Sequence, residues 1–223
     1  MTVAAALLLA SVTTEAVAAT TYTPTGGPAV SFVASVKRSS TQPPSAGAYL
    51  ELIESAQWID CKGFSLGGSV ASPGISRAYG SNAASLGALT TTGCTNGIMG
   101  PTTFTALTTP GFAITGDRTA GGQWPARINN VRWAVHWANC DFYISGFING
   151  KLDPVTGVFT PLGNPRPPGE GVAVGLMISD TPAPPTGSMC VTVDVQAGDT
   201  VGLTGTFANV PPSPSTGLTI ANP

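Results

Sequence analysis

Hydrophobic residues alternate with polar or small residues over short stretches along most of the chain. In residues 29–36 the apolar positions Val30, Phe32, Ala34 and Val36 recur at every second residue. This period of two is typical of a strand with one buried face. Comparable runs lie between turn residues at 63–70, 85–92, 102–107, 111–116, 172–179, 188–195 and 199–207. The pattern therefore predicts many short strands.

The stretch 48–61 fits two interpretations. Its apolar spacing over Tyr49, Leu52 and Ile53 suits a helix, whereas LELI followed by QWIDC suits two strands. We expect two strands and keep a short helix as the alternative, because period alone does not separate short apolar runs.

Residues 126–162 carry the clearest pattern. One face of the first strand is apolar, with Val131, Trp133, Val135 and Trp137, and the other face carries Arg132, Ala134, His136 and Ala138. Beyond Asn139 the parity reverses, and Cys140, Phe142, Ile144 and Ile148 become the apolar face. A shift of one residue moves every side chain to the opposite face of a strand. A bulge or a turn is therefore expected near Ala138 and Asn139.

Turn residues separate the predicted strands. The sequence DPVTG at 153–157 has Asp first, Pro second and Gly last, which favours a type I turn that closes a hairpin. Residues 197–199 predict another turn, and SSTQPPSAG at 39–47 and NPRPPGEG at 164–171 predict loops. Because no confident helix occurs, the chain is expected to be all-β, an antiparallel β-sandwich or barrel with short strands and Gly/Pro-rich turns.

Composition supports a packed extracellular domain. Hydrophobic residues make up 42% of the chain, which favours a folded sheet over disorder, and 28 Gly and 20 Pro supply the turns. Only 9% of residues are charged, and the nine Lys and Arg are scattered singly. A basic patch that would neutralise phosphates is missing from this pattern, so nucleic acid is not an expected partner.

The first nineteen residues have the pattern of a secretory signal peptide. An apolar run from Val3 to Val12 is followed by small residues at 16–19, where a signal peptidase could cut. The run is too short to span a bilayer of roughly 30 Å as a helix. We therefore expect a signal peptide at 1–19 and one secreted or surface-located domain at 20–223, without a transmembrane segment in the mature chain.

Four cysteines follow the predicted signal peptide: Cys61, Cys94, Cys140 and Cys190. An even number in an exported chain favours disulfides, and four cysteines allow three pairings. We predict Cys61 with Cys94 and Cys140 with Cys190, because shorter loops lose less entropy on closure. A metal site would require closely spaced cysteines or several histidines. The chain has one histidine, so neither a metal nor a cofactor is expected.

Two segments carry a resemblance to known proteins, SRAYGSNAASLGALTTTGCTN at 76–96 and PTGSMCVTVDVQAGDTV at 185–201. With its four cysteines and strand layout, the mature chain resembles small exported β-proteins of actinobacteria that have no assigned activity. The resemblance implies export and β structure, and it supplies no catalytic residues.

The sequence GFSLG at 63–67 matches the pattern that presents the serine of some hydrolases on a sharp turn between strand and helix. Ser65, Asp117 and His136 also follow the chain order of that triad. However, glycines and a proline occupy the stretch where the helix would begin. We keep an extracellular serine hydrolase that uses Ser65 as the alternative function, behind a non-catalytic role.

Other catalytic groups are sparse. His136 is the only histidine, and its expected position is the outward face of a strand. Paired carboxylates for glycoside hydrolysis would have to come from Glu51 with Glu54 or from Asp194 with Asp199. The first pair would fall on opposite faces of a strand, and Asp199 belongs to a turn, so neither pair predicts an active site.

Aromatic side chains give the remaining functional hypothesis. The reversed parity after Asn139 places Tyr143 and Phe147 on the face opposite the core, where a ring could stack on a sugar or fill an interface. The alternative is that a loop covers this face. The sequence thus predicts a non-catalytic binding or structural domain that meets a surface glycan or another envelope protein through Tyr143 and Phe147.

Overall fold

The computed structural model describes residues 20–39, 42–45, 47–162 and 174–221, and most of them belong to strands. The predicted signal peptide and the predicted loop 164–171 lie outside the described residues. Four strands are long: β5 (Gln57–Val70), β7 (Asn82–Asn96), β10 (Trp124–Trp137) and β11 (Cys140–Leu152). The shorter strands are β1 (Thr21–Gly26), β2 (Ala29–Ser39), β3 (Gln42–Ser45), β4 (Ala48–Leu52), β6 (Arg77–Ala78), β8 (Gly100–Ala106), β9 (Gly111–Ile114), β12 (Val158–Pro161), β13 (Val174–Ser179), β14 (Thr200–Thr204), β15 (Thr206–Asn209) and β16 (Leu218–Ala221), and α1 (Ser188–Thr192) is a single short helix.

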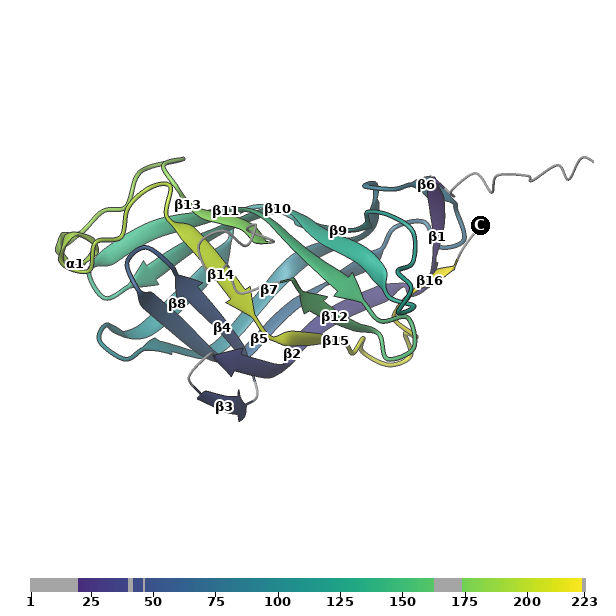
Figure 1. Ribbon diagram of the computed structural model, residues 1–223, viewed down its shortest axis with the longest axis horizontal. Coiled ribbons are helices and arrows are strands. Elements are labelled where there is room, and N and C mark those ends of the chain that lie inside the picture. Colours follow the sequence, from purple (N-terminus) through teal and green to yellow (C-terminus); the bar gives the residue numbers. More distant parts are fainter. Residues whose placement is uncertain (1–19, 40–41, 46, 163–173, 222–223) are drawn as a thin grey trace, which may run out of the picture.

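The main sheet closes on itself. Each long strand occupies one position around the sheet. Four further positions are each filled by two shorter strands placed end to end, and we call each of the eight positions a stave: the paired strands are β2 with β4, β8 with β9, β12 with β13, and β14 with β15. The staves follow one another in chain order, every pairing is antiparallel, and the last stave returns to the first through β15–β2 and β14–β4. The all-β prediction is therefore confirmed, and the pairing forms a closed barrel. Figure 1 shows β10 and β11 along one side and β5 and β2 along the opposite side.

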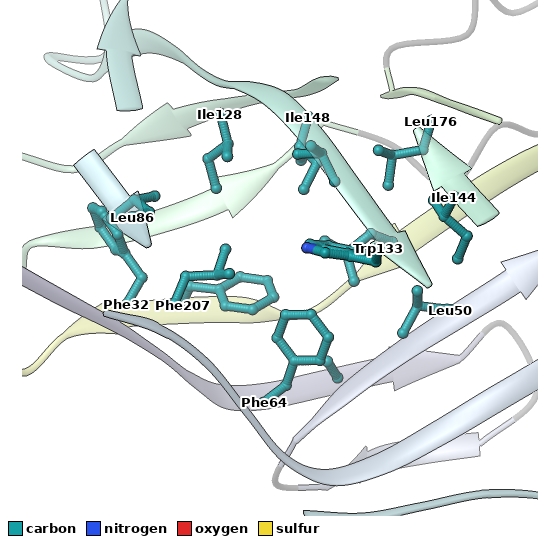
Figure 2. Packing of buried hydrophobic residues seen from close by; sticks show 14 of the residues in the cluster. Phe32, Leu50, Phe64, Leu86, Ile128, Trp133, Ile144, Ile148, Leu176 and Phe207 are labelled. Carbon is teal, nitrogen blue, oxygen red and sulfur yellow. The ribbon is translucent and has the colours of Figure 1, made fainter. Parts of the chain in front are cut away.

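The barrel interior is filled with aromatic and aliphatic side chains. Trp133 is fully buried, and its ring centroid lies 5.4 Å from that of Phe64 in an edge-to-face arrangement. The Phe64 centroid lies 6.1 Å from that of Phe207 of β15. Figure 2 shows these rings at the centre, surrounded by aliphatic side chains from several strands. Such edge-to-face pairs stabilise a core beyond the burial of their area.

The parity reversal after Asn139 is a turn. Trp137 pairs with Cys140, so β10 and β11 join through the two residues Ala138 and Asn139, and Ala138 has a positive φ of 49°. A positive φ at this position is typical of the two-residue turns that match the twist of a hairpin. A separate bulge lies between Ile128 and Val131 of β10. The predicted apolar faces of both strands are confirmed as the inward faces.

The hairpin at Asp153–Gly157 is also confirmed. The Asp153 carboxylate accepts hydrogen bonds from the backbone N–H groups of Val155 and Thr156, at 2.8 and 3.1 Å. These two donors lower the pKa of Asp153. Gly157 has a positive φ of 67° and closes the turn. The predicted strand pair at 48–61 is likewise confirmed, as β4 and the start of β5.

Two local predictions are wrong. Residues 188–195 do not form a strand: Ser188–Thr192 form α1, and the buried Cys190 holds this turn of helix against the start of β11. Part of the predicted loop 39–47 is strand β3, which pairs with the end of β2. The strands expected at 63–70 and 85–92 are also longer than predicted, as β5 and β7.

Both predicted disulfides are present. Cys61 and Cys94 join directly paired positions of β5 and β7, and Cys140 and Cys190 join the start of β11 to α1. All four cysteines are buried. Disulfides form and persist in oxidising compartments, so this covalent frame is compatible with an extracellular protein.

Candidate functional site

The outward side chains of β10 and β11 form one surface, which we call the outer face. Along the ladder, His136 pairs with Asp141, Ala134 with Tyr143, and Arg132 with Ser145, and every one of these side chains points away from the core. Inward residues such as Trp133, Val135 and Ile144 alternate with them. The structure therefore places Tyr143 on the solvent side, as the parity argument predicts.

A shallow cleft of about 320 Å³ lies at one end of the outer face and is called the first cleft. Its polar wall consists of hydroxyl groups from β8 and from the segment before α1, together with a histidine, a carboxylate and a phenol ring. These residues are Thr103, Thr105, Thr186, His136, Asp141 and Tyr143. His136 Nδ1 lies 2.6 Å from Asp141 Oδ1, and both side chains remain exposed.

The Cys140–Cys190 disulfide fixes the rim of the first cleft. Asp141 and Thr186 exchange two backbone hydrogen bonds of 2.9 Å, which bind the segment before α1 to the start of β11. The disulfide joins Cys140, the residue directly before Asp141, to Cys190 in α1. Thr186 is therefore held beside Asp141 by both covalent and backbone bonds.

The two aromatic residues predicted as binding residues differ in their surroundings. The half-buried Phe147 ring lies over Gly175 of β13, so closely that a Cβ at Gly175 would collide with it. The guanidinium of Arg127 lies over the same ring, 4.4 Å from its centroid. Phe147 thus points outward, but its ring is already covered by neighbours from β10 and β13.

Tyr143 is the free ring of the pair. It is half-buried, it lines the first cleft, and among the described residues it has no hydrogen-bond partner and no ring contact. Its cross-strand neighbour is Ala134, whose small side chain leaves the ring uncovered on that side. The ring therefore remains available for stacking on a ligand.

A second cleft of about 350 Å³ begins one outward pair further along the same ladder. Amide, hydroxyl and guanidinium groups surround it: Asn130, Arg132, Ser145, Ser179 and Thr181. Successive outward pairs are roughly 7 Å apart along a strand. The two clefts therefore follow one another along β10 and β11, with Tyr143 at their junction.

The GFSLG sequence does not form a nucleophile elbow. Ser65 lies within β5, where its backbone pairs with Val33 on one side and Thr90 on the other. The strand continues to Val70 without a turn at the serine or a helix after it. The geometry that exposes the serine and builds an oxyanion hole in that fold is absent at Ser65.

The proposed triad partners of Ser65 are bonded elsewhere. His136 contacts Asp141, and Asp117 accepts a hydrogen bond of 2.6 Å from the Tyr79 hydroxyl. Burial and this carboxylate raise the pKa of Tyr79 to about 12. The three residues suggested by chain order therefore do not form a hydrogen-bonded triad.

The candidate carboxylate pairs have structural partners. Glu54 accepts hydrogen bonds from the backbone N–H and the hydroxyl of Thr200, at 2.6 and 2.8 Å. Asp199 is buried and accepts from the backbone N–H of Gln196 at 2.9 Å. Burial, with smaller contributions from Glu54 and Asp194, raises the pKa of Asp199. Within the described residues, no group of three or more His, Cys, Asp or Glu is arranged to hold a metal ion.

Several residues of the clefts were missed by the sequence reasoning. Thr103, Thr105 and Thr186 come from segments whose position beside β10 and β11 depends on the strand order of the barrel. Alternation alone predicted that Arg132 and His136 point outward, but the sequence did not predict that either side chain lines a cleft. The Thr-x-Thr spacing in β8 is the one signal that predicts two hydroxyls on a common face.

Comparisons of the chain with protein-family models, with curated proteins and with solved structures found no match. In the part of the chain that the structure describes, helices long and apolar enough to cross a membrane are not found.

Proposed function

We propose that this chain is a secreted or cell-envelope domain with a non-catalytic binding role, and that it binds a surface glycan on the outer face. The observation that carries the proposal is the uncovered ring of Tyr143 at the junction of two shallow polar clefts. Sugars offer apolar ring faces edged by hydroxyl groups. A flat aromatic ring beside hydroxyl and amide side chains complements both parts of such a ligand.

Phe147 contributes less to the proposed site than Tyr143, because its ring is already covered. Its ring carries the Arg127 guanidinium, which also donates a hydrogen bond from Nε to Asn149 Oδ1 at 2.7 Å. A bound glycan would therefore meet Arg127 and the exposed edge of Phe147 rather than the full Phe147 ring. Tyr143 provides the stacking contact.

The rigid frame around the outer face supports binding without catalysis. The clefts lie on paired strands and on a segment fixed by a disulfide, so little ordering is needed when a ligand binds. The signal peptide predicted at 1–19 and the four disulfide-bonded cysteines support export, as does the resemblance to exported actinobacterial β-proteins.

A glycan array tests the proposal. The mature wild-type domain should bind at least one glycan, and Tyr143→Ala should reduce that binding by tenfold or more, since stacking on an aromatic ring is lost. Trp58→Ala is the matched control, because Trp58 is an exposed aromatic residue on β5, outside the outer face. Absence of binding to every glycan, or equal loss in both variants, would contradict the proposal. Capture of an envelope protein instead would favour the protein partner.

A further inference from the structure

Arg132 is the unusual residue of the second cleft. Its Nε atom is buried and has no hydrogen-bond partner, and among the described residues the side chain makes no ion pair. A buried donor without an acceptor is disfavoured, and most native structures avoid it. Solvent does not reach the Nε atom itself, so a ligand in the second cleft would contact the part of the Arg132 side chain that lines this cleft.

The charge around Arg132 is unbalanced. The outer face carries Arg127, Arg132 and Lys151 as cations, whereas its carboxylate, Asp141, lies against His136 at the far end of the first cleft. A second carboxylate, that of Asp180 after β13, accepts a hydrogen bond from the Thr181 hydroxyl, and Asp180 does not line the second cleft. Arg132 is therefore the one charged side chain among the residues that line the second cleft, and the Asp180 carboxylate lies behind the hydroxyl of Thr181.

We infer that the second cleft binds the carboxylate of an acidic sugar, so that the glycan of the proposed function is a uronate-containing oligosaccharide lying along β10 and β11. One sugar stacks on Tyr143 and the carboxylate of a neighbouring sugar meets the guanidinium of Arg132. This inference rests on the proposed function. Planar guanidinium and carboxylate groups match in two parallel hydrogen bonds, and such charge-assisted bonds are stronger than neutral ones.

The remaining groups of the second cleft fit the same ligand. Ser145 offers a hydroxyl and Asn130 an amide, which pair with sugar hydroxyls but neutralise no charge. The Ser179 and Thr181 hydroxyls donate to Thr181 O and to Asp180, so toward a ligand they act as acceptors. A free anion would need only Arg132. The line of two clefts with a ring between them favours an extended chain of sugars, because a single small anion would leave Tyr143 and the first cleft unused.

Titration calorimetry with matched ligands tests the inference. The probes are tetramers of galacturonate, glucuronate and mannuronate, each compared with its carboxyl-reduced tetramer, which keeps the sugar ring and removes the charge. At least one acidic tetramer should bind roughly ten- to a hundredfold more tightly than its neutral counterpart. This difference should shrink as salt is raised, because exposed charges are screened.

Two variants separate the role of Arg132 from general electrostatics. Arg132→Gln should abolish the preference for the acidic tetramer, and Arg132→Lys should keep part of it, because lysine retains the charge without the planar fork. Lys62→Gln is the control, since it removes one exposed cation from β5 and should leave the preference unchanged. Melting curves of each variant show that the fold persists; if Arg132→Gln does not fold, Arg132→Lys and the salt series carry the test.

The outcomes distinguish the two proposals. Equal affinity for acidic and neutral tetramers, or an acidic preference that survives Arg132→Gln, overturns the inference and leaves glycan binding intact. If the domain binds another glycan of the array but none of the uronate tetramers, the inference is likewise overturned and glycan binding is kept. If no glycan of any kind binds, the proposed function itself is wrong.

Discussion

Truncation of three aromatic residues to alanine should lower the melting temperature by three different amounts, because their rings have three different surroundings. Trp133 is fully buried against Phe64, and loss of such a ring costs about 3–5 kcal/mol. Tyr143 is half-buried on the outer face without a cation against its ring, so its truncation should cost about half of the 1.5–3 kcal/mol gained by burying a whole aromatic side chain, which is about 1 kcal/mol. Phe147 should fall between them.

The intermediate value for Phe147 follows from its two neighbours. A cation–π contact such as that with Arg127 contributes about 0.5–1 kcal/mol at an exposed site. Partial burial over Gly175 adds about half of the 1.5–3 kcal/mol gained by burying a whole phenylalanine. The sum is about 2 kcal/mol.

For a domain of this size 1 kcal/mol corresponds to about 2–4 °C. The expected decreases are therefore roughly 12 °C for Trp133→Ala, roughly 6 °C for Phe147→Ala and roughly 3 °C for Tyr143→Ala. Differential scanning calorimetry measures all three, with Tyr143→Phe as the control that keeps the ring. A decrease for Tyr143→Ala equal to that for Trp133→Ala would refute the reasoning, because Tyr143 would then belong to the core.

Three further predictions concern the frame and the chemistry. Replacing Cys140 and Cys190 by serine should lower the free energy of unfolding by roughly 4 kcal/mol, since the disulfide closes a loop of 50 residues, and urea unfolding measures this; an unchanged midpoint would contradict it. Because burial raises the pKa of Asp199, its proton is held more tightly in the folded state, so its contribution to stability is greatest below about pH 4 and is lost as pH rises through the folded pKa. Asp199→Asn should therefore gain stability relative to wild type between about pH 4 and pH 7, and a constant difference would show the sign to be wrong. A fluorophosphonate probe should not label Ser65, and stoichiometric labelling that disappears in Ser65→Ala would restore the hydrolase alternative.

Local patterning was sufficient to predict the hairpin of β10 and β11. Side chains alternate from Val131 to Trp137 of β10 and along β11, so Trp133 and Phe142 could be assigned to the core and Tyr143 to the outside before the neighbours of either strand were known. The reversal of parity also predicted a bulge or a turn near Ala138 and Asn139, and the structure has a turn there. These features depend on residues close in sequence.

The segment 188–195 shows where alternation misleads. Met189, Val191 and Val193 have the period of a strand, yet the segment contributes a turn of helix. All edges of the main sheet in this region are used by β13, β14 and β4, which leaves no ladder for a further strand. Cys190 is instead anchored to Cys140, and this tertiary bond decides the local conformation.

The clefts could be predicted only in part, for a related reason. Thr105 and Thr186 line the first cleft because their segments pair with β10 and β11, which are far from them in sequence, and that order is set by closure of the barrel. The covering of Phe147 by Gly175 likewise depends on the pairing of β11 with β13. The alternation supplied the direction of each side chain but not its neighbours.

Backbone chemical-shift mapping with a glycan selected on the array tests most directly whether the outer face is the binding surface. Titration into the isotope-labelled domain should shift amide resonances of Arg132, Ala134, Tyr143 and Ser145, together with Thr186 at the rim of the first cleft. Amides near the exposed Trp58 should not move. Shifts confined to the surface around Trp58, with the outer face unaffected, would contradict glycan binding along β10 and β11.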